Sequence, residues 1–375
     1  MSASPLLPAA VPVGVVSVRV RSAARAARSQ PRPRVAATLA RHRLPALAGR
    51  WGSGVAIAAF CAVLAVPSSP VFAQPYPSRP VRLVSPNPPG GANDVIARIV
   101  VNRLAEVLQV PMVIDNRGGA GGTIGGEIAA RAQPDGYTLL AGSISTHTFS
   151  PVIQPKLGYD PVRDFAPISL FAIAQNLLVV NPTVPVKSMA ELLALARAKP
   201  GTLNYASGGT GSTSHFSVAL FVSAAGIAGS TVHIPYKGGA PSVAATVANE
   251  TQFYFGPMAG SVAQVRAGKL RALAVGGSSR SKMMPEVPTA QEAGLAGFEV
   301  SGWFGLLAPA GTPRPIVDRL NRAVRDTVGS ADVQRQLLEV GAEGLSNTPE
   351  QFAKFIATQL ETTRRVVKSM GLKFD

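Results

Sequence analysis

The apolar positions of the chain follow two different spacings. Short runs of β-branched and other apolar residues are typical of buried strands, and longer segments with apolar residues three or four positions apart are typical of helices. The segment from Val95 to Leu108 has this helical spacing. The predicted strands are 81–84, 110–114, 137–141, 168–172, 177–180, 203–207, 232–235, 252–255, 272–275 and 304–308. The predicted helices are 95–108, a segment ending at Arg131, 189–198, 213–225, 241–249, 314–328 and 350–370.

The helix at 189–198 has the clearest boundary. Ser188 is a favourable N-cap, and Glu191 follows three residues later as the partner of a capping box. Strands that alternate with helices predict an α/β fold, in which helices cover both faces of a mostly parallel sheet. Such sheets bind ligands in the loops at the carboxyl ends of their strands, so those loops are the candidates for function.

One strand–loop–helix junction recurs. After the strand at 81–84, Pro86, Pro88 and Pro89 interrupt pairing, and Gly90-Gly91 permits backbone conformations that a side chain would forbid. A helix then begins, leaving N–H groups that can bind an anion. Gly142–His147 and Ser207–Ser212 repeat the pattern. One such junction alone is equally compatible with an ordinary turn, and its recurrence favours a binding function.

The side chains near these loops favour binding over catalysis. No Gly-x-Ser-x-Gly elbow or Walker motif follows residue 73, and His147, His215 and His233 lack metal-ligand spacing. Small hydroxyl residues are abundant instead: Ser143, Ser145, Thr146, Ser207, Thr210, Ser212 and Thr213. Hydrogen bonds to a charged group contribute about 1.5–3 kcal/mol each, so four or five could reach the roughly 8 kcal/mol of a micromolar complex. We expect no metal and no cofactor.

The net charge of +16 is concentrated at the start of the chain. Nine arginines and no acidic residue precede Gln74, which leaves +7 for the remainder and no clustered basic stripe. Nucleic-acid binding is therefore not expected. An apolar run at 55–66 and the small-residue pattern Val71-Phe-Ala73 predict a signal peptide within 1–73, cleaved after Ala73. The run is shorter than the roughly 20 residues of a membrane span. Cleavage would remove Cys61, the only cysteine.

Many short motifs of residues 74–375 resemble one family, the periplasmic receptors of tripartite tricarboxylate transporters, also called Bug receptors. The motifs occur in the family's order over nearly the whole segment. They are Tyr76-Pro-Ser-Arg-Pro80, Pro88-Pro-Gly-Gly91 with Asp94, Asp115-Asn-Arg117, Gly119-Ala-Gly-Gly122, Pro134-Asp-Gly-Tyr137, Tyr159-Asp-Pro-x-x-Asp-Phe165, Leu203-Asn-Tyr-Ala-Ser207, Pro235-Tyr-Lys-Gly238, Ala267-Gly-Lys-Leu-Arg-Ala-Leu-Ala274, Val287-Pro-Thr289 and Trp303-Phe-Gly-Leu-Leu-Ala-Pro309.

The resemblance implies a two-lobed periplasmic-binding-protein fold of type II, the Venus flytrap, each lobe having a mixed, mostly parallel sheet flanked by helices. Lobe 1 would comprise 74–174 and 298–375, and lobe 2 would comprise 175–297. A carboxylate would lie between them, held by four loops. The implied ligand-binding residues are Asn87, Pro89, Gly91, Ala92, Asp94, Ser145, Thr146, His147, Ser207, Gly208, Thr210, Gly211, Ser212, His215, Tyr236, Lys237 and Gly238.

Two departures from the family bear on the ligand. Asn87 replaces a frequent aromatic residue, and Gly256-Pro257 stands where many members have an aspartate. The second departure argues against an amino-acid ligand, whose ammonium needs a counter-charge. We therefore expect a non-catalytic, monomeric periplasmic receptor for a di- or tricarboxylate-like acid, with transporter membrane subunits as partners. Two alternatives stay open: a receptor that signals to a sensor kinase, and a hydrolase using Ser212 and His215.

Overall fold

A computed structural model describes residues 76–154 and 156–370, so the predicted signal peptide lies outside the described residues. Its first sheet is built around β1 (Val81–Ser85), whose buried Val81, Leu83 and Val84 match the predicted strand. The sheet continues through β2 (Met112–Asn116), β3 (Thr138–Ser143), β9 (Ser301–Pro309), β4 (Phe165–Val180) and β10 (Ala342–Gly344). β1 pairs in parallel with β2 and β3, whereas β9 pairs antiparallel with β3 and β4.

A second sheet adjoins the first through β4. It contains β5 (Leu203–Ser207), β6 (Thr231–Pro235), β7 (Phe253–Pro257) and β8 (Arg271–Val275). β5 runs parallel to β6 and β7, and β4 runs antiparallel to β7 and β8. The expectation of mixed sheets is confirmed, but the described strands are not mostly parallel. The strands joined by the predicted strand–helix units pair in parallel, whereas every pair that includes β4 or β9 is antiparallel, and these pairs are at least as many.

Among the strands of residues 76–154 and 156–370, β4 alone belongs to both sheets. The sequence predicted two strands here, 168–172 and 177–180, because the segment between them includes polar residues. The structure instead has one strand of 16 residues. It pairs with β9 as far as Gln175, and its pairing with β7 begins at Asn176. The buried Asn176 side chain at this point of the strand donates one hydrogen bond, from its Nδ2 to Ser217 Oγ at 2.7 Å.

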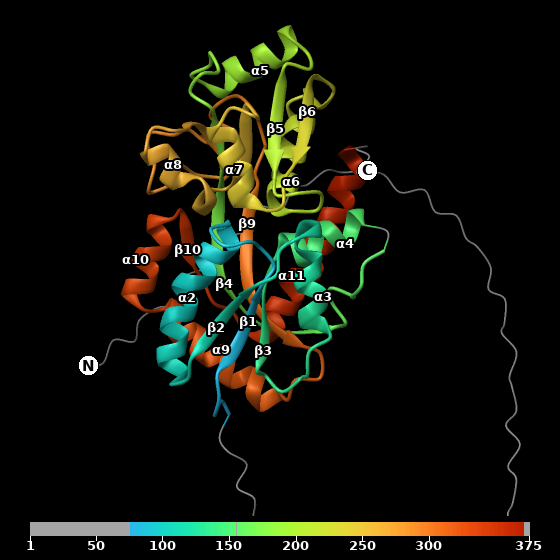
Figure 1. The fold of residues 1–375 in the computed structure, drawn as a ribbon, viewed down its shortest axis with the longest axis vertical. Coiled ribbons are helices and arrows are strands. Elements are labelled where there is room, and N and C mark those ends of the chain that lie inside the picture. Colours follow the sequence, from blue (N-terminus) through green and yellow to red (C-terminus); the bar gives the residue numbers. More distant parts are fainter. Residues whose placement is uncertain (1–75, 155, 371–375) are drawn as a thin grey trace, which may run out of the picture. The chain divides into compact units, whose positions relative to one another are not determined.

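The helices cover both sheets, as Figure 1 shows, with α2, α9 and α10 beside the first and α5, α7 and α8 beside the second. Their bounds are α2 Ala92–Leu108, α3 Thr123–Ala130, α4 Ser150–Ile153, α5 Met189–Ala198, α6 Thr213–Ala224, α7 Gly239–Val247, α8 Val262–Arg266, α9 Arg314–Val328, α10 Ala331–Glu339 and α11 Pro349–Met370. The predicted bounds of α5 and α9 are confirmed, and α10 was not predicted. Within 76–154 and 156–370, no helix is both long and apolar enough to cross a bilayer.

Local sequence explains the helix boundaries. Ser188 Oγ accepts the Glu191 N–H at 3.2 Å, so Ser188 caps α5 as predicted. Glu191 Oε2 accepts the N–H of Lys187 at 2.6 Å, one residue before the N-cap, so the return bond of the predicted capping box goes to Lys187 instead of Ser188. In α9, Val317, Leu320 and Val324 are buried at helical spacing in the hydrophobic core that also contains Val81 and Leu83 of β1. These contacts fix the helices on the sheets, and the loops between strands and helices are thereby held in place.

Candidate functional site

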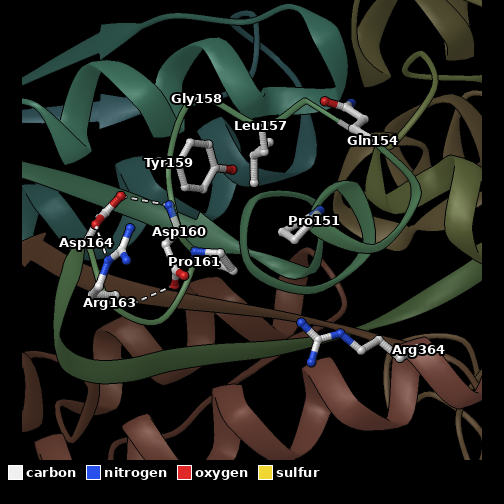
Figure 2. Close-up of a pocket in the computed structure, with 10 residues that line it drawn as sticks. All are labelled: Pro151, Gln154, Leu157, Gly158, Tyr159, Asp160, Pro161, Arg163, Asp164 and Arg364. Carbon is white, nitrogen blue, oxygen red and sulfur yellow. Dashed lines mark hydrogen bonds and ion pairs between the residues drawn. The ribbon is translucent and has the colours of Figure 1, made fainter. Parts of the chain in front are cut away.

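A wide hollow of about 410 Å³ lies on the surface beside α4 and α11, and none of the predicted ligand-binding residues lines it (Figure 2). The carboxylates that line it stabilise the turn from Asp160 to Asp164. Asp160 accepts the N–H groups of Val162 and Arg163, and Asp164 accepts the Asp160 N–H at 2.7 Å. Those N–H groups, first Arg163 and then Val162, hold the pKa of Asp160 below its usual range. The charged residues of the Tyr159–Phe165 motif therefore have a structural explanation.

The Pro-Pro-Gly-Gly loop between β1 and α2 is fixed by Asp94. This carboxylate is 2% exposed and accepts hydrogen bonds from the Gly90 N–H at 2.9 Å and Asn116 Nδ2 at 2.8 Å, in addition to an ion pair with Arg98. Burial alone would raise the pKa of Asp94, but the bonds from Arg98, Asn116 and Gly90 outweigh it and hold this pKa below its usual value. Its oxygens are thus engaged with the loop itself.

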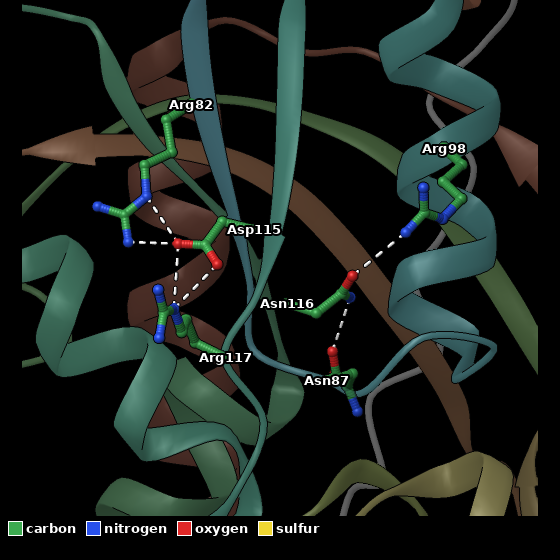
Figure 3. A network of polar contacts seen from close by, with 6 residues as sticks. All are labelled: Arg82, Asn87, Arg98, Asp115, Asn116 and Arg117. Atoms are coloured by element: carbon green, nitrogen blue, oxygen red, sulfur yellow. Dashed lines mark hydrogen bonds and ion pairs between the residues drawn. The ribbon is translucent and has the colours of Figure 1, made fainter.

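Asn116 connects the same loop to β2. Its Nδ2 also donates to the Asn87 carbonyl at 2.9 Å, and Arg98 Nη2 donates to its Oδ1 at 3.2 Å (Figure 3). Beside it, Arg82 and Arg117 both pair with Asp115, the second at 2.9 Å. Asn116 of the Asp115-Asn-Arg117 motif therefore holds the loop from the neighbouring strand, while Asp115 pairs with Arg82 of β1 and with Arg117.

The loop between β5 and α6 has a comparable internal network. Ser212 Oγ caps α6 by accepting the His215 N–H at 3.1 Å, and His215 Nδ1 accepts the Gly211 N–H at 3.2 Å. Ser207 Oγ accepts the Gly209 N–H and contacts His233 Nε2 at 2.6 Å. Gly209 and Gly211 have φ values of +99° and +86°, which favour glycine. The alternative in which Ser212 and His215 act as a hydrolytic pair is not supported, because both groups maintain the loop.

The histidines behind this loop are neutral. The rings of His215 and His233 stack with centroids 4.4 Å apart and planes 4° apart. Burial, joined at His215 by the charge of His233, lowers the pKa of His215 to about 3, and burial lowers that of His233 to about 4. A neutral His215 can keep its Nδ1 as the acceptor for Gly211, which a protonated ring could not do.

Loops that follow strands of the first sheet closely approach loops that follow strands of the second. A Cβ atom at Gly238, which precedes α7, would overlap the Pro88 ring, and one at Gly121 would overlap the Thr210 carbonyl. Ser150 Oγ donates to the Gly211 carbonyl at 3.0 Å. Glycine is therefore required where the loop of the first sheet meets the loops of the second.

A small cavity of about 30 Å³ lies where these loops meet. The first residues of three helices contribute to it: Ala92 and Asn93 of α2, Thr213 and Ser214 of α6, and Gly239 of α7. The first N–H groups of a helix have no partner within it and favour an anion. The complete lining contains no charged side chain: Asn87, Ala92, Asn93, Ser143, Gly208, Ser212, Thr213, Ser214, Gly239, Tyr254, Pro257 and Phe304.

The cavity also offers neutral donors. Tyr254 contacts Ser214, and burial raises the pKa of Tyr254 to about 12, which keeps its hydroxyl protonated. Ser214 Oγ accepts the Gly208 N–H at 2.9 Å. A volume of about 30 Å³ is close to the share of one liquid water and far below the roughly 300 Å³ of a small-molecule site. The loops must therefore separate for an organic acid to enter.

The structure places only part of the predicted residue set on this cavity. Asn87, Ala92, Gly208 and Ser212 line it. The other predicted residues lie outside the lining, several of them in the networks that shape the loops: Pro89, Gly91, Asp94, Ser145, Thr146, His147, Ser207, Thr210, Gly211, His215, Tyr236, Lys237 and Gly238. Their direct contact with a ligand stays a prediction.

Thr146 and His147 are held inside the first sheet's core. His147 is fully buried between Phe165 and Trp303, with ring centroids 4.8 and 6.1 Å away, and burial lowers its pKa to about 3. Its Nδ1 lies 2.8 Å from Thr146 Oγ1, which also accepts the Ser143 N–H at 3.0 Å. In this loop it is Ser143 that lines the cavity, so the two predicted residues position the end of β3.

Four residues that line the cavity are absent from the predicted ligand-binding residues: Asn93, Thr213, Ser214 and Gly239. The sequence could have indicated them, because each lies at one of the first two positions of a helix, where the backbone N–H groups have no partner within the helix. Pro257, one of the two departures noted above, does line the cavity. No carboxylate accompanies it. Among the described residues, no group of three or more His, Cys, Asp or Glu side chains could hold a metal ion.

Comparison with solved structures shows that this chain has the fold of periplasmic binding proteins. A solved structure described as a periplasmic transporter is 40% identical, with a TM-score of 0.78 over 80% of this chain and 100% of that one. An R. palustris protein with adipate is 34% identical (TM-score 0.77; 80% and 99% covered). MatC from Rhodopseudomonas palustris with bound malate is also 34% identical (TM-score 0.74; 78% and 100% covered).

The family follows from residues 96–372, which match the model of the tripartite tricarboxylate transporter family receptor. This chain belongs to that family, as its motifs predicted. The family consists of solute-binding proteins and not of enzymes.

Proposed function

We propose that this protein is an extracytoplasmic receptor that binds a small di- or tricarboxylate-like acid and delivers it to a tripartite tricarboxylate-type transporter. The observation that carries the proposal is the meeting of three helix N-termini at one cavity without a charged side chain. Helix termini and hydroxyls bind a carboxylate through oriented dipoles, and each helix terminus contributes about 0.3–2 kcal/mol. The relatives with adipate and malate support the same ligand class.

We assign the contacts between the loops to closure of two lobes. Lobe 1 comprises 74–174 and 298–375, lobe 2 comprises 175–297, and β4 and β9 act as the connection. A ligand enters when the lobes are apart, and the Pro88–Gly238 and Ser150–Gly211 contacts form as they close. The protein acts in the periplasm after removal of residues 1–73.

The absence of a carboxylate from the cavity lining also supports selectivity. An α-amino acid would bring an ammonium to a site of N–H and O–H donors, where its charge has no partner and costs binding energy. We therefore assign organic acids without an ammonium as ligands, in agreement with Pro257 at the position noted above.

Isothermal titration calorimetry of the mature chain tests the function. Succinate, adipate and citrate are titrated, with the diamides of succinate and adipate as neutral controls. We expect micromolar binding of at least one acid and no detectable binding of the matching diamide. Equal binding of acid and diamide would contradict the anion mechanism, and tighter binding of aspartate than of succinate would contradict the assigned selectivity.

A further inference from the structure

Asn93 is the one cavity-lining residue whose buried side-chain oxygen lacks a partner among residues 76–154 and 156–370. The residue is 3% exposed and lies in the first turn of α2. Its Nδ2 donates to the Ala141 carbonyl at 2.9 Å. Since a carbonyl can only accept, this bond fixes which end of the amide is nitrogen, and Oδ1 is left as an acceptor.

Asn93 Oδ1 can only accept a hydrogen bond, and this separates it from the groups of the site that can donate to a carboxylate. Helix N–H groups and the Tyr254 hydroxyl are donors, and they satisfy a carboxylate. Oδ1 would repel the same carboxylate, and a buried acceptor without a partner costs about 1–3 kcal/mol. A ligand that carries a donor next to its carboxylate satisfies both kinds of group. A hydroxyl is such a donor, and it adds no charge to a lining that has none.

We propose that Asn93 is a specificity-determining residue that selects hydroxycarboxylates, its Oδ1 accepting a hydrogen bond from the ligand hydroxyl. This inference rests on the proposed function, because it names the substrate class of the same site. A 2-oxo acid presents only an acceptor at the corresponding carbon, so it is disfavoured even though its size is nearly the same.

The first test uses the unaltered mature chain. Calorimetry compares succinate with both enantiomers of malate, and glutarate with both enantiomers of 2-hydroxyglutarate and with 2-oxoglutarate. We expect one hydroxy acid to bind about tenfold more tightly than its unsubstituted partner, the gain of one buried hydrogen bond. The 2-oxo acid is expected to bind no better than glutarate. Equal affinities within each set, or preference for the 2-oxo acid, would overturn the assignment.

The second test assigns the selectivity to Asn93. In Asn93→Ala the preference for the hydroxy acid should fall to less than twofold, while the unsubstituted acid still binds. Asn181→Ala is the matched control, since Asn181 is also a buried amide whose Nδ2 donates to a backbone carbonyl, at 2.9 Å, but it does not line the cavity. Its preference should equal that of the unaltered chain. A preference retained in Asn93→Ala would overturn the proposal.

The outcomes distinguish a failure of the Asn93 assignment from a failure of the receptor function. If acids bind without preference for the hydroxyl, the inference about Asn93 fails and the receptor function stands. If no acid in any set binds, the proposed function itself fails. If Asn93→Ala does not fold, the comparison of hydroxy, oxo and unsubstituted acids on the unaltered chain decides the inference.

Discussion

Gly238→Ala should weaken ligand binding by preventing closure. Gly238 has φ +123° and ψ 171°, a conformation essentially confined to glycine, and an added Cβ would overlap Pro88 Cγ and Cδ. The Pro88 ring cannot rotate away as a flexible side chain would. Overpacking of this kind costs about 1–3 kcal/mol, and the closed state bears that cost because the overlap arises only where the two loops meet.

The magnitude predicts a fall in affinity of about 5- to 150-fold. Calorimetry with the best acid from the panel measures it. Gly294→Ala is the matched control, because Gly294 also has a positive φ, +103°, and nothing lies within 4 Å of an added Cβ. Both variants should lose stability through backbone strain, but only Gly238→Ala should lose affinity.

A double variant completes the test. Pro88→Ala removes the ring atoms that the new Cβ would meet, so Gly238→Ala with Pro88→Ala should recover most of the lost affinity, and the coupling should appear in a double-mutant cycle. Equal losses of affinity in Gly238→Ala and Gly294→Ala, or no recovery in the double variant, would refute closure through this contact.

Two further predictions concern stability. Asp94→Asn should lower the free energy of unfolding by about 2 kcal/mol in urea at pH 7, because it removes the charged acceptor of Gly90, Asn116 and Arg98. Because the folded-state pKa of Asp94 is lowered, its contribution is present above the unfolded pKa of about 3.9 and is lost at lower pH; a loss below 0.5 kcal/mol at pH 7 would contradict this role. His147→Gln should flatten the fall in stability on acidification by up to about 1.4 kcal/mol per pH unit, since the pKa of buried His147 is about 3 and its stabilisation is lost as the pH falls below about 6.5. An unchanged slope between pH 6.5 and 4 would contradict a neutral buried imidazole.

Local chemistry made much of the fold predictable. Ser188 and Glu191 marked the start of α5, and the apolar spacing of Val317, Leu320 and Val324 marked α9. Gly90-Gly91 followed by Ala92 correctly placed a strand–loop–helix junction. These features depend on residues close in sequence, which is why their sequence pattern was sufficient.

Features set by distant residues were not predictable in the same way. Nothing local shows that β4 continues through Gln175 and Asn176, because its two halves pair with strands more than 70 residues away. The environment of His147 depends on Phe165 and Trp303, which its own loop does not reveal. In sequence, hydroxyl and histidine side chains in a loop look like ligand-binding residues. In this structure Ser207, Ser212 and His215 instead accept hydrogen bonds from backbone N–H groups of their own loop and helix start.

We expect N–H groups at the starts of helices beside both sheets to hold one carboxylate of the ligand. A crystal structure of the mature chain with bound malate tests it most directly. We expect carboxylate oxygens about 2.7–3.1 Å from N–H groups at the start of α2 and at the start of α6 or α7. A carboxylate held instead by a lysine or arginine side chain, or bound in the hollow beside Tyr159 and Arg364, would contradict it.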